Sequence, residues 1–266
     1  MVWINGALQE TVVARDRAVQ FGDGCFTTAR ILGGKVVSQD AHLSRLKAGC
    51  ERLLIPNVDW DALADEMQRA AATRSVGVLK AILSRGTGGR GYSAQDCEQP
   101  TRMIFLSAYP AHYQRLQQTG ATLALSTVRL GKNPRLAGIK HLNRLEQVLI
   151  RTELDQTGAD EALVLDSDGS LVECCAANLF WRKGEAVFTP DLSQCGVSGI
   201  QRQKVIQRLH VLGMPVREVS LPVQTLADAE EVFITNALMP VLPVKQIDRW
   251  HYASRTLFNL LRLHDD

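Results

Sequence analysis

The stretch from 138 to 158 constrains the fold most, because it places a lysine, Lys140, at the head of an amphipathic repeat. Apolar residues recur there at helical spacing while charged residues mark the opposite face, which predicts a helix. The apolar positions are Leu142, Leu145, Val148 and Leu149. Gly158 is predicted to end this helix in the left-handed conformation that glycine tolerates best.

The spacing leaves the chemistry of Lys140 open. A lysine is normally a solvated surface charge. A lysine held against apolar neighbours behaves differently, because desolvation can lower the pKa of its amine by up to about 3–5 units. The neutral amine is then a nucleophile that can form a Schiff base.

Composition excludes several classes of protein. The chain has 266 residues, is 45% hydrophobic and 22% charged, and carries a formal net charge of +2, so we expect no bulk attraction to nucleic acid or membranes. The start resembles no secretory signal, and the apolar stretch 232–244 is too short to cross a bilayer. Six cysteines and six histidines show no metal-ligand spacing. The sequence therefore predicts a cytoplasmic protein with reduced cysteines and no metal.

The first half of the chain reads as a hairpin around Asn5-Gly6, helices from Asp40 and over Trp60–Ala72, and strands over 76–83 and 103–108. Tyr109-Pro110 follows, and no apolar periodicity spans the gap. We therefore expect a smaller domain over 1–108, a linker over 109–117 and a larger domain over 118–266 that carries Lys140.

The second half reads as a strand over 122–130, two hairpins over 161–174 and 178–189, a helix from the Gly196–Arg202 loop towards Leu212, and a strand over 231–236. The loop before the helix and the end of the last strand could each bind a phosphate, because free backbone N–H groups favour one. Simple helix capping would explain the first loop's glycines equally well.

Two features of the first half could compete with these sites. Lys80 lies inside an apolar strand and rivals Lys140, although alternation places it with Val78 and Ile82 on a half-exposed face. The loop 86–91 spells GxGxxG, but a polar loop follows instead of the helix that a dinucleotide site requires. Either the loop simply joins two strands, or Arg85 and Arg90 bind substrate carboxylates.

Several blocks resemble the pyridoxal-phosphate enzymes of fold type IV, the group of branched-chain and D-amino-acid aminotransferases. The lysine motif is Leu136 to Leu145, and further blocks are Phe21–Thr28, Ser84–Tyr92, Glu173–Phe180 and Asn236–Pro240. The resemblance covers nearly the whole chain. It implies an α/β fold of the α+β type, with two domains, pyridoxal 5'-phosphate between them, and a homodimer.

The resemblance also implies roles for individual residues. Lys140 would be the Schiff-base residue and proton-transfer base, Glu173 the partner of the pyridine nitrogen, and Thr28 a further catalytic residue. Arg45 would grip the cofactor phosphate, as suits a planar bidentate donor. The remaining cofactor contacts would come from Asn178, Gly199, Ile200, Asn236 and Ala237.

Within the family the blocks are most similar to the lyase branch, whose members convert 4-amino-4-deoxychorismate to 4-aminobenzoate and pyruvate in folate biosynthesis. This substrate carries two carboxylates, which suits Arg85 and Arg90. An aminotransferase of the same fold is the main alternative, but the branched-chain group typically has a tyrosine where Arg144 follows Asn143. A non-catalytic protein that binds a phosphate ligand is an alternative of a different class.

Overall fold

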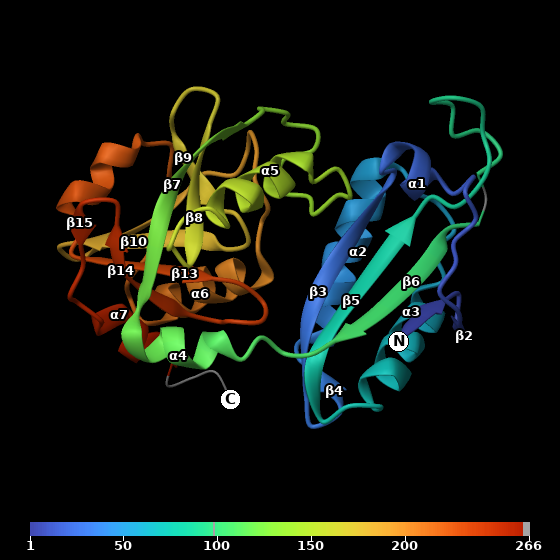
Figure 1. Ribbon diagram of the computed structural model, residues 1–266, viewed down its shortest axis with the longest axis horizontal. Coiled ribbons are helices and arrows are strands. Elements are labelled where there is room, and N and C mark those ends of the chain that lie inside the picture. Colours follow the sequence, from blue (N-terminus) through green and yellow to red (C-terminus); the bar gives the residue numbers. More distant parts are fainter. Residues whose placement is uncertain (98, 263–266) are drawn as a thin grey trace. The chain divides into compact units, whose positions relative to one another are not determined.

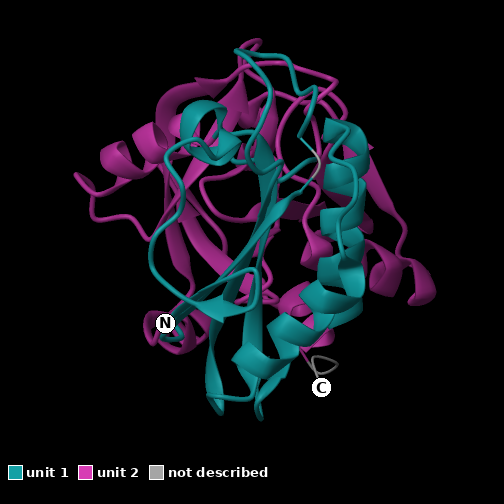
Figure 2. Cartoon of the chain, turned by 90° about the vertical axis from the view of Figure 1, so that its right-hand side faces the viewer, with its two compact units in different colours: residues 1–109, 139–143 teal, residues 110–138, 144–266 magenta. Residues whose placement is uncertain are grey.

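The structure is a computed structural model that describes residues 1–97 and 99–262 (Figure 1). Its contacts divide the chain into two compact units (Figure 2). Unit 1 comprises Met1–Tyr109 and Ile139–Asn143, and unit 2 comprises Pro110–Gly138 and Arg144–Asp266. The short segment that contains Lys140 thus belongs with unit 1, although the residues on both sides of it belong with unit 2.

Unit 1 is built on an antiparallel six-stranded sheet with the order β2-β1-β6-β5-β3-β4. The strands are β1 (Val2–Ile4), β2 (Ala7–Leu8), β3 (Gly24–Leu32), β4 (Lys35–Val36), β5 (Val76–Ser84) and β6 (Thr101–Ser107). The predicted first hairpin is confirmed, and Asn5 and Gly6 both have the positive φ of a tight primed turn.

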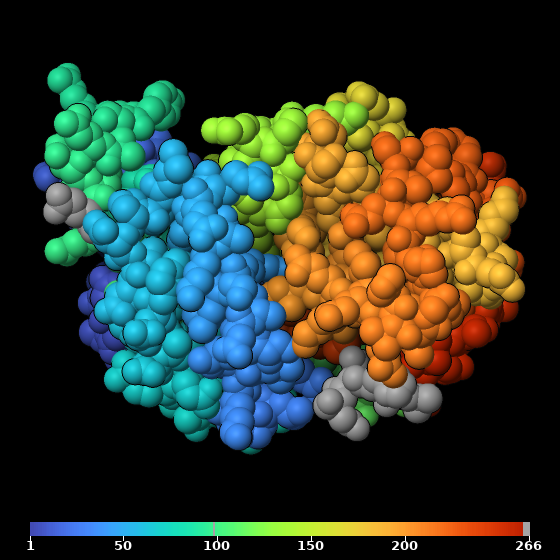
Figure 3. Space-filling view, turned by 180° about the vertical axis from the view of Figure 1, so that it is seen from behind, coloured from blue at the N-terminus to red at the C-terminus, as the bar shows by residue number. Residues whose placement is uncertain are grey.

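Three helices complete unit 1, namely α1 (Arg17–Phe21), α2 (Gln39–Leu53) and α3 (Trp60–Ala71). Alternation along β3 and β5 sends every second side chain into the core that these helices cover. Leu46 of α2 and Leu63 and Met67 of α3 are fully buried there against residues of the sheet. The sheet residues in this core include Ala29, Ile31, Leu79, Ala81 and Leu83. The outer surface of α2 is exposed, in blue, in Figure 3.

Unit 2 contains a nine-stranded mixed sheet with the order β12-β11-β10-β13-β14-β7-β8-β9, and β15 pairs with β14. Only the pairs β7–β8, β7–β14 and β11–β12 are parallel among the described strands. The strands are β7 (Ala121–Leu130), β8 (Glu161–Asp166), β9 (Leu171–Cys174), β10 (Asn178–Lys183), β11 (Ala186–Pro190), β12 (Val216–Val219), β13 (Glu231–Thr235), β14 (Leu242–Ile247) and β15 (Trp250–His251).

The helices of unit 2 are α4 (His112–Thr119), α5 (Leu145–Leu154), α6 (Ile200–Val211), the 3-10 helix η1 (Val223–Asp228) and α7 (Thr256–Arg262). α6 and α7 share a core with β10 and β13 through the stacked rings of Phe180 and Phe233. α5 packs on β7 and β8 through Ile150 and Leu154. Both hairpins predicted between 161 and 189 are confirmed. α4 occupies most of the stretch expected to be a linker.

The helix after Lys140 differs from the prediction in three ways. It begins only at Leu145, so Lys140 precedes it instead of heading it. The apolar positions predicted to be its packed face are largely exposed, with Leu145 at 78%, Val148 at 57% and Leu149 at 56%. The helix ends at Leu154, and Gly158 has no positive φ. Periodicity identified the helix but could not tell which of two apolar faces is buried.

All six cysteines are free, and five of them are buried. No helix in the described part of the chain has both the length and the apolar character needed to span a membrane.

A substitution at Gly24 tests how closely β3 packs against its neighbours. A Cβ atom at Gly24 would lie 2.2 Å from the carbonyl oxygen of Leu83 and 2.8 Å from a methyl group of Leu142. Overpacking of this kind costs about 1–3 kcal/mol, so Gly24→Ala should lower the thermal unfolding midpoint by roughly 5 °C. Gly158→Ala is the matched control, because a Cβ there meets nothing within 4 Å. Equal midpoints for the two variants would contradict the packing.

Candidate active site

The backbone around Lys140 is held by β3. The amide of Phe26 donates to the carbonyl of Lys140 (2.9 Å), and the amide of Leu142 donates to the carbonyl of Gly24 (3.0 Å). Cys25 and His141 form an antiparallel bridge between these two bonds. The side chain of Asn143 adds a bond to the carbonyl of Gly22 (3.2 Å). The lysine segment is therefore a short extra strand, fixed in register within unit 1.

The side chain of Lys140 is half-buried, and its Nζ lies 4.7 Å from the centroid of the Phe26 ring. The Nζ of Lys80 lies at the same distance from the same ring. Burial lowers the pKa of Lys80, because desolvation disfavours the charged amine. Lys80 and Lys140, which the sequence presented as rivals, are thus neighbours on one aromatic ring.

The other predicted residues of unit 1 lie on two elements. Thr28 is on β3, directly opposite Lys80 on β5, and is half-buried. Its neighbour Thr27 points into the core and hydrogen-bonds His42 of α2 (2.6 Å). Arg45 is on α2 and is half-buried.

A buried ion cluster supports the segment that holds Lys140. Asp23 accepts hydrogen bonds from the guanidinium groups of Arg17 (2.8 Å) and Arg85 (2.8 and 3.1 Å). Burial alone would raise the pKa of Asp23, but the hydrogen bonds and charges of Arg85 and Arg17 outweigh it and lower the pKa. Arg17 also donates to carbonyls of the glycine-rich loop, those of Gly91 and Ser93. The sequence analysis assigned no role to Arg17 or Asp23, although Asp23 lies inside the block Phe21–Thr28 and Arg17 lies shortly before it.

The two arginines of the glycine-rich loop lie in different environments. Arg85 is only 8% exposed and donates to Asp23 and to the carbonyls of Leu53 and Leu54 at the end of α2. Arg90 is exposed. Binding of a substrate carboxylate by either residue stays a prediction, and the contacts of Arg85 do not favour it. No helix follows this loop within the described residues, in keeping with the rejection of a dinucleotide site.

In unit 2, a glycine turn gathers two of the predicted cofactor residues. Glu173, at 5% exposure, accepts the amide hydrogen of Val197 through Oε2 (2.9 Å), and Asn178 donates to the carbonyl of the same residue (2.9 Å). A Cβ atom at Gly199 would lie 2.0 Å from Oδ1 of Asn178, so any larger residue there would have to displace the side chain of Asn178. Burial lowers the pKa of Arg144 while the negative charge of Glu173 opposes that change, which places a cation near this carboxylate.

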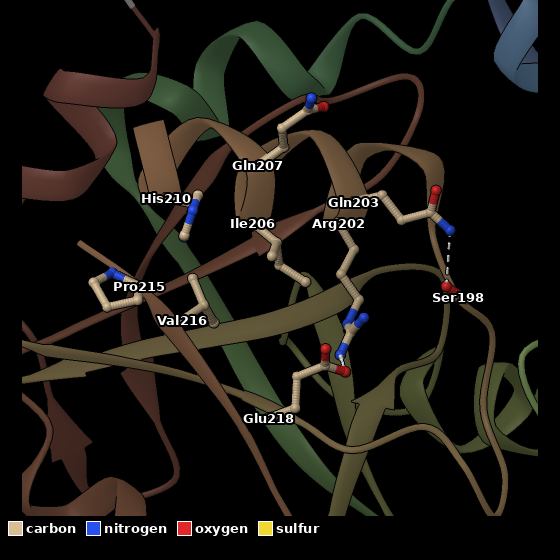
Figure 4. Close-up of a pocket in the computed structure, with 9 residues that line it drawn as sticks. All are labelled: Ser198, Arg202, Gln203, Ile206, Gln207, His210, Pro215, Val216 and Glu218. Atoms are coloured by element: carbon tan, nitrogen blue, oxygen red, sulfur yellow. Dashed lines mark hydrogen bonds and ion pairs between the residues drawn. The ribbon is translucent and has the colours of Figure 1, made fainter. Parts of the chain in front are cut away.

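The turn leads directly into α6, whose N-cap is Gly199 with no side-chain cap. The first amides of an uncapped helix are suited to an anion. Figure 4 shows one flank of α6, where a hollow of about 530 Å³ is lined by residues of the helix, of β12 and of the segments just before them. There Gln203 donates to the hydroxyl of Ser198 (3.1 Å), and Arg202 pairs with Glu218 (2.6 Å). These bonds hold the helix start without using its backbone amides.

The end of β13 is the second predicted phosphate loop. Oδ1 of Asn236 accepts the amides of Leu238 and Met239 (both 2.9 Å), and its Nδ2 donates to the carbonyl of Ala176 (3.1 Å). The side chain of Asn236 therefore shapes the loop that carries Ala237. Thr235, opposite Asn178 in the sheet, is fully buried, and its hydroxyl has no hydrogen-bond partner among the described residues. The sequence analysis did not single out Thr235, although a hydroxyl at the end of an apolar strand could have indicated it.

The sequence matches the class IV amino-transferase family over residues 24–247, and the chain belongs to that family. It is therefore a pyridoxal-phosphate enzyme of fold type IV. It is 40% identical over 247 residues, 93% of this chain and 91% of the relative, to an aminodeoxychorismate lyase of Vibrio harveyi. Its fold is similar to that of the 4-amino-4-deoxychorismate lyase of Pseudomonas aeruginosa, with a TM-score of 0.94 and 37% identity over 100% of both chains.

The branched-chain amino acid aminotransferase of Escherichia coli has the same fold, with a TM-score of 0.86 and 22% identity over 98% of this chain and 92% of that one.

The residues of unit 2 fit the cofactor of this family. A buried carboxylate, Glu173, suits a protonated ring nitrogen, because a carboxylate only accepts hydrogen bonds. An uncapped helix start and the buried Thr235 hydroxyl offer donors to a phosphate. In unit 1, the half-buried amine of Lys140 is the one predicted to form the Schiff base, and this role stays a prediction.

The roles of Arg85 and Arg90 can be distinguished by the thermal unfolding midpoints of their alanine variants. Arg85→Ala should cost about 3 kcal/mol, because it leaves the buried Asp23 with one cation fewer and removes donors from two carbonyls. The thermal midpoint should fall by roughly 5–10 °C. Arg90→Ala should leave the midpoint within roughly 1 °C, so that a rise in substrate KM would identify it as a substrate ligand. A raised KM with an unchanged midpoint in Arg85→Ala would return the substrate role to that residue.

Proposed function

We propose that the protein is a lyase that converts 4-amino-4-deoxychorismate to 4-aminobenzoate and pyruvate in folate biosynthesis. The observation that carries this proposal is the similarity to aminodeoxychorismate lyases over nearly the whole chain. The fixed register of the Lys140 segment and the buried carboxylate of Glu173 support it.

In this proposal the cofactor is held by the residues that the family resemblance implies. Lys140 provides the amine, Glu173 holds the ring nitrogen in its protonated form, and Arg45 binds the phosphate. Further contacts come from Asn178, Gly199, Ile200, Asn236 and Ala237, to which we add the hydroxyl of Thr235. When bound, pyridoxal phosphate supplies an aldehyde for the substrate amine and an acceptor for the electrons left when a proton departs.

Lys140 then acts as the proton-transfer base. It removes the proton from the amine-bearing carbon of the substrate, and the enolpyruvyl ether leaves from the neighbouring carbon. Its backbone bonds to β3 keep the amine in a narrow range of positions, and orientation of this kind is a large part of catalysis. Thr28, on the same sheet, is proposed to assist at the departing group.

An aminotransferase of the same fold is the alternative. It would use the same lysine and the same first proton transfer, and the two reactions part only afterwards. Elimination is favoured because the product ring becomes aromatic, and a tenfold preference needs only about 1.4 kcal/mol between the barriers. Arg144 occupies the position where the branched-chain group typically has a tyrosine, which also favours the lyase. A protein that only binds a phosphate ligand would lack a yellow chromophore that borohydride can reduce.

We further infer that the protein is cytoplasmic and works as a homodimer. Three large aliphatic side chains of α5, those of Leu145, Val148 and Leu149, are more than half exposed on one helix face. Exposed apolar groups of this size on a short helix are typical of an interface between copies of a chain.

The reaction type can be tested by its stoichiometry. Purified protein incubated with 4-amino-4-deoxychorismate should release one pyruvate per 4-aminobenzoate without any added oxo acid. The pyridoxamine form of the cofactor should not accumulate, since elimination regenerates the starting cofactor. Absorbance spectra and product assays measure both. Turnover that requires an oxo acid and returns the corresponding amino acid would establish the aminotransferase alternative instead.

The dimer can be tested at α5. Leu145→Asp puts a charge on the proposed interface, and the variant should sediment as a monomer at concentrations where the wild type is a dimer. Val211→Asp is the control, because Val211 is equally exposed but lies at the end of α6. A wild-type monomer, or a dimer that tolerates the charge, would refute this interface.

A further inference from the structure

Two cysteines of unit 1 lie side by side between the sheet and α2, and we call them the thiol pair. Cys25 is the second residue of β3, Cys50 lies in the last turn of α2, and each is only 2% exposed. Their sulfur atoms are 3.9 Å apart. Gly49 permits this approach, because a Cβ atom there would lie 2.9 Å from the Sγ of Cys25. A closing movement of about 2 Å would bring the two sulfurs to the length of a disulfide bond.

A hollow at the end of α2 leads to one member of the thiol pair. Cys50 lines this hollow of about 630 Å³ together with Lys47 and Trp60. Leu54, which also lines it, is 78% exposed, so the hollow opens to solvent there. A molecule as small as hydrogen peroxide fits a space of this size. Cys25 does not line the hollow, so Cys50 is the thiol that a small oxidant reaches first.

The surroundings of the thiol pair favour a thiolate on Cys50, and the thiolate is the nucleophilic form of a cysteine. The hydrogen bond with Cys25 lowers the pKa of Cys50, and the positive charge of Arg85 adds to this effect, although burial opposes it. Arg85 donates to the carbonyls of Leu53 and Leu54, which places its charge at the same end of α2. The hydrogen bond with Cys50 and burial both raise the pKa of Cys25, which therefore keeps its proton.

We propose that Cys25 and Cys50 are a redox site at which a hydroperoxide forms a reversible disulfide. The sulfur of Cys50 attacks one peroxide oxygen, the O–O bond breaks, and the departing oxygen leaves as water with the thiol proton. The sulfur of Cys25 then attacks the sulfenic acid on Cys50, and the S–O bond breaks to release a second water. The two sulfurs lose two electrons in all, and the peroxide gains them.

The position of the thiol pair indicates what the disulfide protects. Cys25 forms the bridge with His141, and its neighbour Phe26 donates to the carbonyl of Lys140. Further oxidation of Cys50 would place a sulfinic acid in the packed core beneath this segment, and that product is irreversible. Attack by Cys25 removes the sulfenic acid before that step. A small thiol can then reduce the disulfide and restore both cysteines.

The test treats the protein loaded with pyridoxal phosphate with hydrogen peroxide, under conditions that fully oxidise an unstructured cysteine peptide in the same solution. Thiols are counted after denaturation, and mass spectrometry of peptides locates each disulfide and each sulfur acid. Parallel samples contain dimedone, which labels sulfenic acids. The variants are Cys25→Ser and Cys50→Ser. Cys175→Ser is the matched control, because Cys175 is more exposed than the thiol pair, whereas burial raises its pKa to about 12.

We expect the wild type to lose two of its six thiols and to contain a disulfide between Cys25 and Cys50. Dithiothreitol should restore all six. Cys25→Ser should accumulate dimedone-labelled Cys50 about tenfold above the wild type, because no second thiol removes the sulfenic acid. Cys50→Ser should form no disulfide, and Cys175→Ser should form the same disulfide as the wild type.

Three results would overturn the proposal. The first is a wild type that keeps all six thiols under these conditions. The second is oxidation of Cys175 ahead of Cys50, which would show that exposure alone decides reactivity. The third is as much sulfinic acid on Cys50 in the wild type as in Cys25→Ser, since Cys25 would then give no protection. The first two results come from the wild type, so they do not depend on the folding of any variant.

Discussion

The backbone bonds between β3 and the Lys140 segment are the constraint on which the rest of the site depends. The amide of Phe26 and the carbonyl of Gly24 fix Lys140 and Leu142 in register. Two residues earlier, Gly138 exchanges hydrogen bonds with the turn at Gly196 and Ser198 in unit 2. Backbone hydrogen bonds thus flank the lysine on both sides, and the rotatable bonds of its side chain set the position of its amine.

The ion cluster of Asp23, Arg17 and Arg85 stabilises that arrangement. Asp23 immediately precedes the strand that holds Lys140, and two arginines hold its carboxylate in the folded chain. The pKa of Asp23 is lower in the folded chain than in the unfolded one. The cluster therefore stabilises the fold fully at pH values above the usual pKa of an aspartate. That stability is lost as the pH falls through the folded pKa and Asp23 takes up a proton. Arg17 also donates hydrogen bonds to the carbonyls of Gly91 and Ser93, which joins the ion cluster to the glycine-rich loop.

Local signals predicted most elements but not the direction in which side chains point. Alternation and turn residues located the hairpins at Asn5-Gly6 and Gly169, because both depend on neighbours in sequence. The apolar face of α5 was misjudged, since Leu145 and Ile150 are equally apolar and only tertiary packing distinguishes them. Arg85 is similar: a glycine-rich loop suggests ligand binding, whereas its partner Asp23 lies far away in the sequence. The family resemblance named the candidate site residues, and packing between distant segments determines what each of them touches.

The Phe26 ring shows how one residue of β3 contacts two lysines. The Nζ atoms of Lys80 and Lys140 each lie 4.7 Å from its centroid. Burial lowers the pKa of Lys80, because desolvation disfavours the charged amine. The backbone amide of the same phenylalanine donates to the carbonyl of Lys140, so Phe26 positions the lysine segment through its amide and contacts the lysine amine through its ring.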